Sequence, residues 1–207
     1  TEFTDGLGNI LTKVPYPVYV VSQVVTDDGS QVASTLTYEY SGGSYYVSGP
    51  FDHQFAGFDL VTETDAAGNK TKTFYHAGNA SDATSGEYQD NYWKIAKPYR
   101  MEVYDAAGNL YRKIINKWDS YSLGSGAGFA KLIQTTEASY DGLVSHRDKA
   151  ESYTYDNATG NQTQKVAWGE VAAADDGTFT DTGTDKFTTD IAYAAGPSGV
   201  VGKPSVV

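Results

Sequence analysis

Three histidines, His53, His76 and His146, are the side chains of this sequence best suited to acid–base or metal chemistry near neutral pH. Their positions along the chain do not match the ligand spacing of a zinc site, and the sequence contains no cysteine. His146 begins a His-Arg-Asp triplet like that of protein kinases, but the position that a kinase fills with asparagine is Tyr153. We therefore interpret all three as ordinary strand or loop histidines and predict no metal site and no cofactor.

Carboxylates are the second group that could do chemistry, because the chain has 26 acidic residues. Asp175, Asp176, Asp181 and Asp185 lie close together in the sequence and could offer oxygen ligands to Ca²⁺. They lack the spacing of an EF-hand, so a solvated acidic loop is the simpler interpretation. No spacing singles out a carboxylate pair for glycoside hydrolysis, and the sequence predicts no catalytic residue.

Two segments are polar or rich in glycine and are expected to be loops. Residues 77–92 (AGNASDATSGEYQDNY) are expected to be exposed, and residues 120–128 (SYSLGSGAG) to form a mobile connection. The second segment has neither the glycine spacing of a dinucleotide-binding loop nor the Gly-Lys-Ser/Thr ending of a phosphate-binding loop. A phosphate site is therefore not predicted.

The composition indicates an all-β protein without long helices. The 207 residues include 17 Tyr, 8 Phe, 3 Trp and 22 Gly, and aromatic and glycine residues favour strands and tight turns. The net charge of −11 repels phosphate backbones and anionic lipid surfaces, so neither nucleic-acid binding nor membrane insertion is expected. No apolar run approaches the roughly 20 residues that a membrane-spanning helix needs.

The pentapeptide Asp-Ala-Ala-Gly-Asn occurs twice, at 65–69 and at 105–109. It fits a three-residue hairpin loop, which is a type I turn followed by one left-handed residue that is nearly always glycine. The aspartate before the loop can accept hydrogen bonds from the N–H groups of the turn. A looser copy at 156–161 has one more loop residue. The predicted turn-defining residues are Asp65, Gly68, Asn69, Asp105, Gly108, Asn109, Asp156, Gly160 and Asn161.

These loops fix which residues lie opposite each other in the flanking strands. Around the first copy, we expect the pairs Thr64–Lys70, Val61–Thr73 and Leu60–Phe74. Around the second, we expect the pairs Tyr104–Leu110, Val103–Tyr111 and Glu102–Arg112. Turns of this kind recur along the chain, which predicts meandering antiparallel β-hairpins that form a curved strip with little helix.

Tyr-Asp-x-x-Gly-Asn followed by a polar strand resembles the YD repeat of Rhs (rearrangement hotspot) proteins. The chain also resembles the segment that precedes the Rhs repeats in the B components of insecticidal Tc toxin complexes and related virulence proteins. The blocks that carry this resemblance are 55–78 (FAGFDLVTETDAAGNKTKTFYHAG), 97–118 (KPYRMEVYDAAGNLYRKIINKW), 153–171 (YTYDNATGNQTQKVAWGEV) and 187–207 (FTTDIAYAAGPSGVVGKPSVV).

In that family, the resemblance implies, hairpins join edge to edge into a hollow shell that encloses a toxic C-terminal cargo. This chain would be a non-catalytic wall segment of a longer secreted bacterial polypeptide, and its partners would be the rest of that polypeptide and its cargo. Open strand edges would also permit edge-to-edge self-association. We expect residues 36–207 to form the shell-like hairpin segment and residues 1–35 to be an N-terminal strand pair or linker.

The alternative is a free-standing β-sheet module that binds carbohydrate or a cell surface in the manner of an adhesin. It is motivated by the three tryptophans, Trp93, Trp118 and Trp168, together with several tyrosines that could line a sugar-binding face. Aromatic side chains on hairpins more often pack into the core of the sheet, which favours the structural interpretation.

Overall fold

The computed structural model describes residues 14, 16–27, 29, 33–47, 53–78, 82–124, 126–194 and 204–206. Its strands are β1 (Gln23–Asp27), β2 (Ala33–Val47), β3 (His53–Thr64), β4 (Lys70–Tyr75), β5 (Pro98–Tyr104), β6 (Leu110–Gly124), β7 (Ala127–Ser139), β8 (Arg147–Tyr155), β9 (Gln162–Ala173), β10 (Phe179–Asp181), β11 (Phe187–Asp190), β12 (Ala192–Tyr193) and β13 (Pro204–Val206). Two 3₁₀ turns, η1 (Ala83–Ser85) and η2 (Tyr92–Lys94), lie between β4 and β5.

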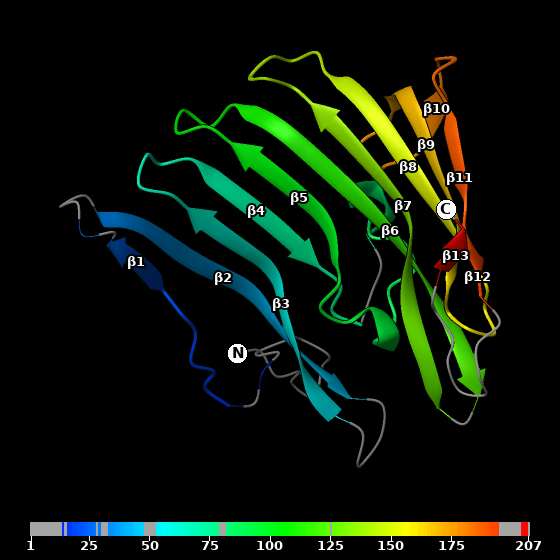
Figure 1. The fold of residues 1–207 in the computed structure, drawn as a ribbon. Coiled ribbons are helices and arrows are strands. Elements are labelled where there is room, and N and C mark those ends of the chain that lie inside the picture. The colour runs from blue at the N-terminus through cyan, green and yellow to red at the C-terminus, as the bar shows by residue number, and fades with distance from the viewer. Residues whose placement is uncertain are drawn as a thin grey trace.

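One curved sheet of eleven strands forms most of the molecule (Figure 1). From β1 to β10 each strand pairs antiparallel with the next strand in the sequence, and β11 pairs with an earlier part of the same edge of β9 that β10 occupies. A separate pair, β12 and β13, forms a small second sheet. Short hairpin turns produce this order because they place consecutive strands side by side. The predicted all-β meander with little helix is confirmed.

The two faces of the sheet differ in burial, and we call the buried one the covered face. A row across β5 to β8 on this face runs from Arg100 through Ile115 and Thr136 to Ala150. The last three of these residues are only 1–3% exposed. Residues on the opposite face of the same strands, such as Ile114 and Lys149, are more accessible.

Two connecting segments fold over the covered face and meet above Ile115. One is the long connection between β4 and β5, and the other is the β9–β10 turn at 174–178. A Cβ atom on Gly86 of the first would lie 2.7 Å from Ile115 Cγ2, and one on Gly177 of the second would lie 2.5 Å from it. Glycine at both positions therefore lets the two backbones approach Ile115 more closely than a side chain would allow.

One loop prediction was partly wrong and a second was wrong. The 77–92 segment was expected to be exposed, and Tyr88 and Tyr92 within it are exposed, but Ala77 and Glu87 are only 5% and 7% exposed because the segment packs on the covered face. The 120–128 segment was expected to be a mobile connection. Instead, β6 extends to Gly124 and β7 begins at Ala127, and the pairing of Ser120 with Ala130 belongs to the same ladder.

The predicted register is confirmed around the first pentapeptide and is partly wrong around the second. The pairs Thr64–Lys70, Val61–Thr73 and Leu60–Phe74 are observed. Tyr104 lies opposite Leu110 as expected, but the register then shifts by one residue.

The shift replaces the other two pairs predicted around the second pentapeptide. Val103 faces Arg112 instead of Tyr111, and Glu102 faces Lys113 instead of Arg112. The cause is a β-bulge at Tyr111, whose carbonyl oxygen accepts the backbone N–H groups of Tyr140 and Asp141 from the neighbouring hairpin.

The predicted division between residues 1–35 and 36–207 stays a prediction. Residues 1–13, 15, 28 and 30–32 lie outside the described residues. Within the described part, β1 pairs with β2 from Gln23–Thr37 to Asp27–Ala33, so this hairpin spans the proposed boundary.

Candidate functional site

The two Asp-Ala-Ala-Gly-Asn turns have the same hydrogen-bonded geometry. In the first, Gly68 has φ +89° and donates its N–H to the Asp65 carbonyl oxygen at 3.0 Å. The Asp65 carboxylate accepts the N–H groups of Ala67 and Asn69, both at 2.9 Å, and the Asn69 side-chain amide at 2.8 Å. The Asn69 side chain, followed by the N–H groups of the turn, lowers the pKa of Asp65.

The second copy repeats this arrangement, and in the third the Asp156 carboxylate accepts the Ala158 N–H and the Thr159 hydroxyl instead. Asn109 donates both its backbone N–H and its side-chain amide to Asp105 at 2.8 Å, and Gly108 has φ +89°. In the longer third turn, Gly160 has φ +74° and donates to the Asp156 carbonyl oxygen at 2.8 Å. The Asn161 carbonyl oxygen accepts the Asp156 N–H at 2.9 Å. In each turn the aspartate therefore acts as an internal acceptor for the loop.

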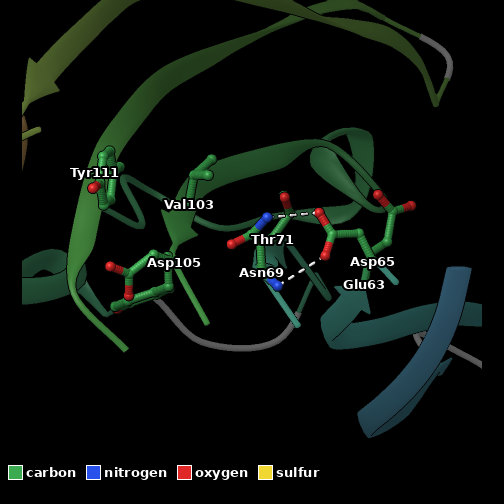
Figure 2. Close-up of a pocket in the computed structure, with 8 residues that line it drawn as sticks. Glu63, Asp65, Asn69, Thr71, Val103, Asp105 and Tyr111 are labelled. Atoms are coloured by element: carbon green, nitrogen blue, oxygen red, sulfur yellow. Dashed lines mark hydrogen bonds between the residues drawn. The ribbon is translucent and has the colours of Figure 1, made fainter. Parts of the chain in front are cut away.

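Pairing of β4 with β5 places the first two turns next to each other at one end of the sheet. A Cβ atom on Gly68 would lie 3.3 Å from the Ala106 Cβ atom, so the turns are in van der Waals contact. Between them is an open groove of about 450 Å³ (Figure 2). Its lining is acidic and aromatic: Glu63, Asp65, Asn69, Thr71, Val103, Tyr104, Asp105 and Tyr111.

The polar side chains of the groove support the turns and are not arranged as a reaction centre. Figure 2 shows Asp65 directed at Asn69 of its own turn, with both dashed hydrogen bonds inside the loop. Tyr104 donates its hydroxyl to Glu102 at 2.7 Å, and burial, followed by this carboxylate, raises the pKa of Tyr104 to about 12. At neutral pH this phenol is therefore a proton donor with a fixed partner and cannot act as a base.

A charged network ties the β9–β10 turn to the middle of the covered face. Asp175 accepts hydrogen bonds from Lys113 of β6 and from Arg100 of β5, the latter at 3.3 Å. Because β5 lies four strands from β9, about 19 Å away at ordinary strand spacing, the turn must reach back over the sheet. Burial would raise the pKa of Asp175, but Lys113 and Arg100 outweigh it and lower this pKa.

A second polar cluster is buried beneath the connection between β4 and β5. His76 and Lys94 are 0% exposed, and the Asp90 side chain is also 0% exposed. The His76 Nδ1 atom lies 3.1 Å from Asp90 Oδ1 and 3.4 Å from Glu87 Oε1. Burial would lower the pKa of His76, but Asp90 and Glu87 outweigh it and raise this pKa.

Lys94 is held on the other side of this segment by backbone carbonyl groups. Its Nζ atom donates to the carbonyl oxygens of Tyr88 at 2.7 Å and Gln89 at 2.6 Å. Burial lowers the pKa of Lys94, an effect that the charges of Asp119, Asp90 and Glu87 oppose. Sequence spacing gave no signal for this cluster, because its members come together only when the segment folds over the sheet.

The remaining residues considered from sequence have separate surroundings. His146 Nδ1 contacts Asp148 Oδ1, and Asp148 Oδ2 accepts the Ala173 N–H at 2.9 Å. His53 begins β3. Asp176 accepts the Thr178 N–H of its own turn, and Asp185 accepts the Glu170 N–H of β9, so both acids are bonded to backbone donors. Among the described residues, the one group of His, Cys, Asp and Glu side chains that converges as metal ligands do is that of His76, Glu87 and Asp90.

The tryptophans contact protein groups in different parts of the fold. Trp118 donates its indole N–H to the Pro98 carbonyl oxygen and Trp168 donates to Ser152 Oγ, both at 2.9 Å. Trp168 also packs against Phe179, and Trp93 covers Gly128. They form no shared sugar-binding platform with one another in the part of the chain described by the structure, so the adhesin-like alternative gains no support from them.

Comparison with known proteins gives one family match. Residues 8–85 match the family described as the insecticide toxin TcdB middle/N-terminal region. This match confirms the resemblance to the B component of Tc toxins, and it covers less than half of the 207 residues. It begins before the first described strand and ends within the connection between β4 and β5. A search of curated proteins found no match.

In the described part of the chain, no helix is long and apolar enough to cross a bilayer.

Proposed function

We propose that this chain is a structural, non-catalytic wall segment of an Rhs/Tc-toxin-type β-shell that encapsulates a toxic C-terminal cargo. The observation that carries the proposal is the strictly sequential antiparallel order of the sheet from β1 to β10. A strip in which every strand follows its neighbour in sequence can be extended by further hairpins at either edge. The match of residues 8–85 to a Tc toxin region supports the same assignment.

The outer edge of β1 has the properties of a strand edge that can pair with a further strand. All five residues of β1 are exposed, and its partner within the described sheet is β2 alone. Val24 and Val25 are 40% and 57% exposed, and the strand contains no lysine or proline that would discourage pairing. Backbone N–H and C=O groups along that edge could therefore pair with a preceding hairpin of a longer polypeptide.

The turns support a non-catalytic role. Asp65, Asp105 and Asp156, the acids at the repeated motifs, accept hydrogen bonds within their own loops. A carboxylate that holds a turn together is a structural group, since its acceptor positions are already used. The partners that fit this role are the rest of a secreted bacterial polypeptide and its cargo, and isolated copies could self-associate through the same edges.

Hydrogen–deuterium exchange tests the proposed use of the β1 edge. The amides of β1 should exchange at least about tenfold more slowly in the full-length toxin polypeptide than in the isolated 207-residue chain, because a neighbouring strand would protect them. The matched control is the central strand β6, which is already paired on both sides and should change little. Equal exchange of the β1 amides in the two proteins would overturn the proposal. In a separate experiment, sedimentation velocity over a range of concentrations would measure self-association of the isolated chain.

A further inference from the structure

The buried cluster of His76, Glu87 and Asp90 has an arrangement that the wall role does not require. One imidazole nitrogen and two carboxylate oxygens converge within 4.8 Å of one another. The His76 Nδ1 atom is 3.1 Å from Asp90 Oδ1 and 3.4 Å from Glu87 Oε1. Ligand atoms about 2.0–2.2 Å from a tetrahedral zinc ion are about 3.3–3.6 Å apart, so these separations are close to those of a zinc site.

Other contacts fix the direction of each ligand before any ion binds. Glu87 Oε2 accepts the Asp82 N–H at 3.0 Å, which leaves Oε1 on the side of His76. The backbone between the two acids is held in a left-handed conformation at Gln89, with φ +46°. A non-glycine residue in this region is strained, and such strain is concentrated at binding sites.

His76 is anchored at the base of the segment by its backbone. Its N–H donates to the Lys97 carbonyl oxygen and its carbonyl oxygen accepts the Ala96 N–H, both at 3.0 Å. The Tyr99 ring packs against the imidazole at a centroid distance of 5.3 Å. The imidazole is therefore held rigidly at the end of β4, facing the two acids from the middle of the segment.

The buried imidazole of His76 is not satisfied by hydrogen bonds. Neither ring nitrogen of His76 has a hydrogen-bond partner among the described residues, although the side chain is 0% exposed. The contacts of Nδ1 with the two acids have the length of ion pairs but lack hydrogen-bond geometry. A buried nitrogen without a partner is unfavourable, and metal coordination is one way to satisfy it.

The charges of the cluster favour a bound cation. The carboxylates of Glu87 and Asp90 oppose one buried lysine, Lys94, whose ammonium group is turned toward the carbonyl oxygens of Tyr88 and Gln89. A divalent cation bound here would balance the two carboxylates in place of a proton on His76. Buried charges are normally paired or bound to metals.

We propose that His76, Glu87 and Asp90 bind a divalent first-row metal ion, with Zn²⁺ the best match to one imidazole and two carboxylates. A site with three protein ligands leaves a fourth position for water. The ion would join the end of β4 to the middle of the β4–β5 connection and so hold this segment on the covered face. Its role is structural, and it is independent of whether the chain belongs to a shell.

Zinc binding to the untagged 207-residue chain tests the proposal. The protein is stripped with a chelator, and Zn²⁺ binding is then measured by calorimetry and by metal analysis after buffer exchange. The wild-type chain should bind one Zn²⁺, and the variants His76→Gln and Glu87→Gln should bind it at least about 100-fold more weakly, because loss of even an outer partner costs 10–100-fold.

The matched control is His146→Gln. His146 is also a histidine against an aspartate, Asp148, but it belongs to no group of three converging ligands in the described structure. This variant should bind Zn²⁺ as tightly as the wild type. Absence of zinc binding by the wild-type chain, or equal binding by His76→Gln, would overturn the proposal and leave a protonated His76 between two carboxylates as the structure of the cluster.

Cobalt substitution keeps the test decisive if a variant fails to fold. Co²⁺ bound to the wild-type chain should give the intense visible absorption of a four-coordinate site, and excess Zn²⁺ should abolish it. A weak spectrum like that of hydrated Co²⁺ would show that the three ligands do not bind the ion together, which would also overturn the proposal.

Discussion

Replacing Ile115 with alanine should destabilise the chain much more than the same change at its neighbour Ile114. Ile115 is 1% exposed on the covered face, whereas Ile114 lies on the opposite face and is only partly buried. Truncation of a buried isoleucine to alanine costs 2–5 kcal/mol. Gly86 and Gly177, which contact Ile115, have no side chains that could move into the space, so we expect a loss clear of the lower end of that range, about 3–4 kcal/mol.

The corresponding loss for Ile114→Ala should be about 1 kcal/mol, because a half-buried side chain contributes roughly half of its full transfer free energy. Both substitutions lose the same strand preference. The difference between their losses of unfolding free energy, about 2–3 kcal/mol, therefore measures the packing of Ile115 on the covered face. For a chain of this length 1 kcal/mol shifts Tm by about 2–4 °C, so Ile115→Ala should lower Tm by about 6–16 °C.

Urea unfolding followed by tryptophan fluorescence and circular dichroism measures this difference. The midpoint for Ile115→Ala should fall well below that for Ile114→Ala, with the same slope for both variants and the wild type. If the two variants unfold at the same urea concentration, the β4–β5 connection and the β9–β10 turn do not cover one face of the sheet, and the reasoning is wrong.

Two further predictions concern the repeated turns. Gly108→Ala should cost about 1–2 kcal/mol in urea unfolding, because φ is +89° and the site is otherwise open; Gly68→Ala should cost more, because its new Cβ would also crowd the adjacent turn. For Tyr104, the folded pKa of about 12 lies above the unfolded value of 10.0, so the unfolded chain loses this proton first. Its stabilising effect is complete below about pH 10 and is lost as pH rises toward about 12, and Tyr104→Phe should make the fall in stability over that window shallower.

Each of these predictions has a clear contrary result. Equal costs at Gly68 and Gly108 would show that the two turns are not in contact. An absorbance titration at 295 nm in which every tyrosine of the native chain ionises near its ordinary pKa would contradict the Tyr104 environment, as would identical pH profiles for the wild type and Tyr104→Phe.

Local chemistry explains why the turns and the first register could be predicted. Asp65, Gly68 and Asn69 determine their loop through contacts within five residues, and the loop then fixes the pairs beyond it. The bulge at Tyr111 could not be predicted in this way. Its carbonyl oxygen is bonded by Tyr140 and Asp141, which belong to the next hairpin.

The buried cluster of His76, Glu87 and Asp90 also depends on contacts between distant parts of the chain, which local sequence does not indicate. A polar segment such as 77–92 has the composition of an exposed loop, and nothing in its sequence indicates that it covers a sheet. Glu87 becomes buried because Gly86 beside it allows close contact with Ile115. The approach of His76 to Asp90 follows from that packing, so sequence spacing alone did not predict it.

The size of the polypeptide that carries this sequence in its own cells tests the proposed wall role most directly. Peptides of this chain should be found by mass spectrometry in a protein far larger than 22.3 kDa, which also contains further Tyr-Asp-x-x-Gly hairpins and a C-terminal cargo. A native protein of about 22.3 kDa would contradict the wall role and make this sheet a free-standing β domain.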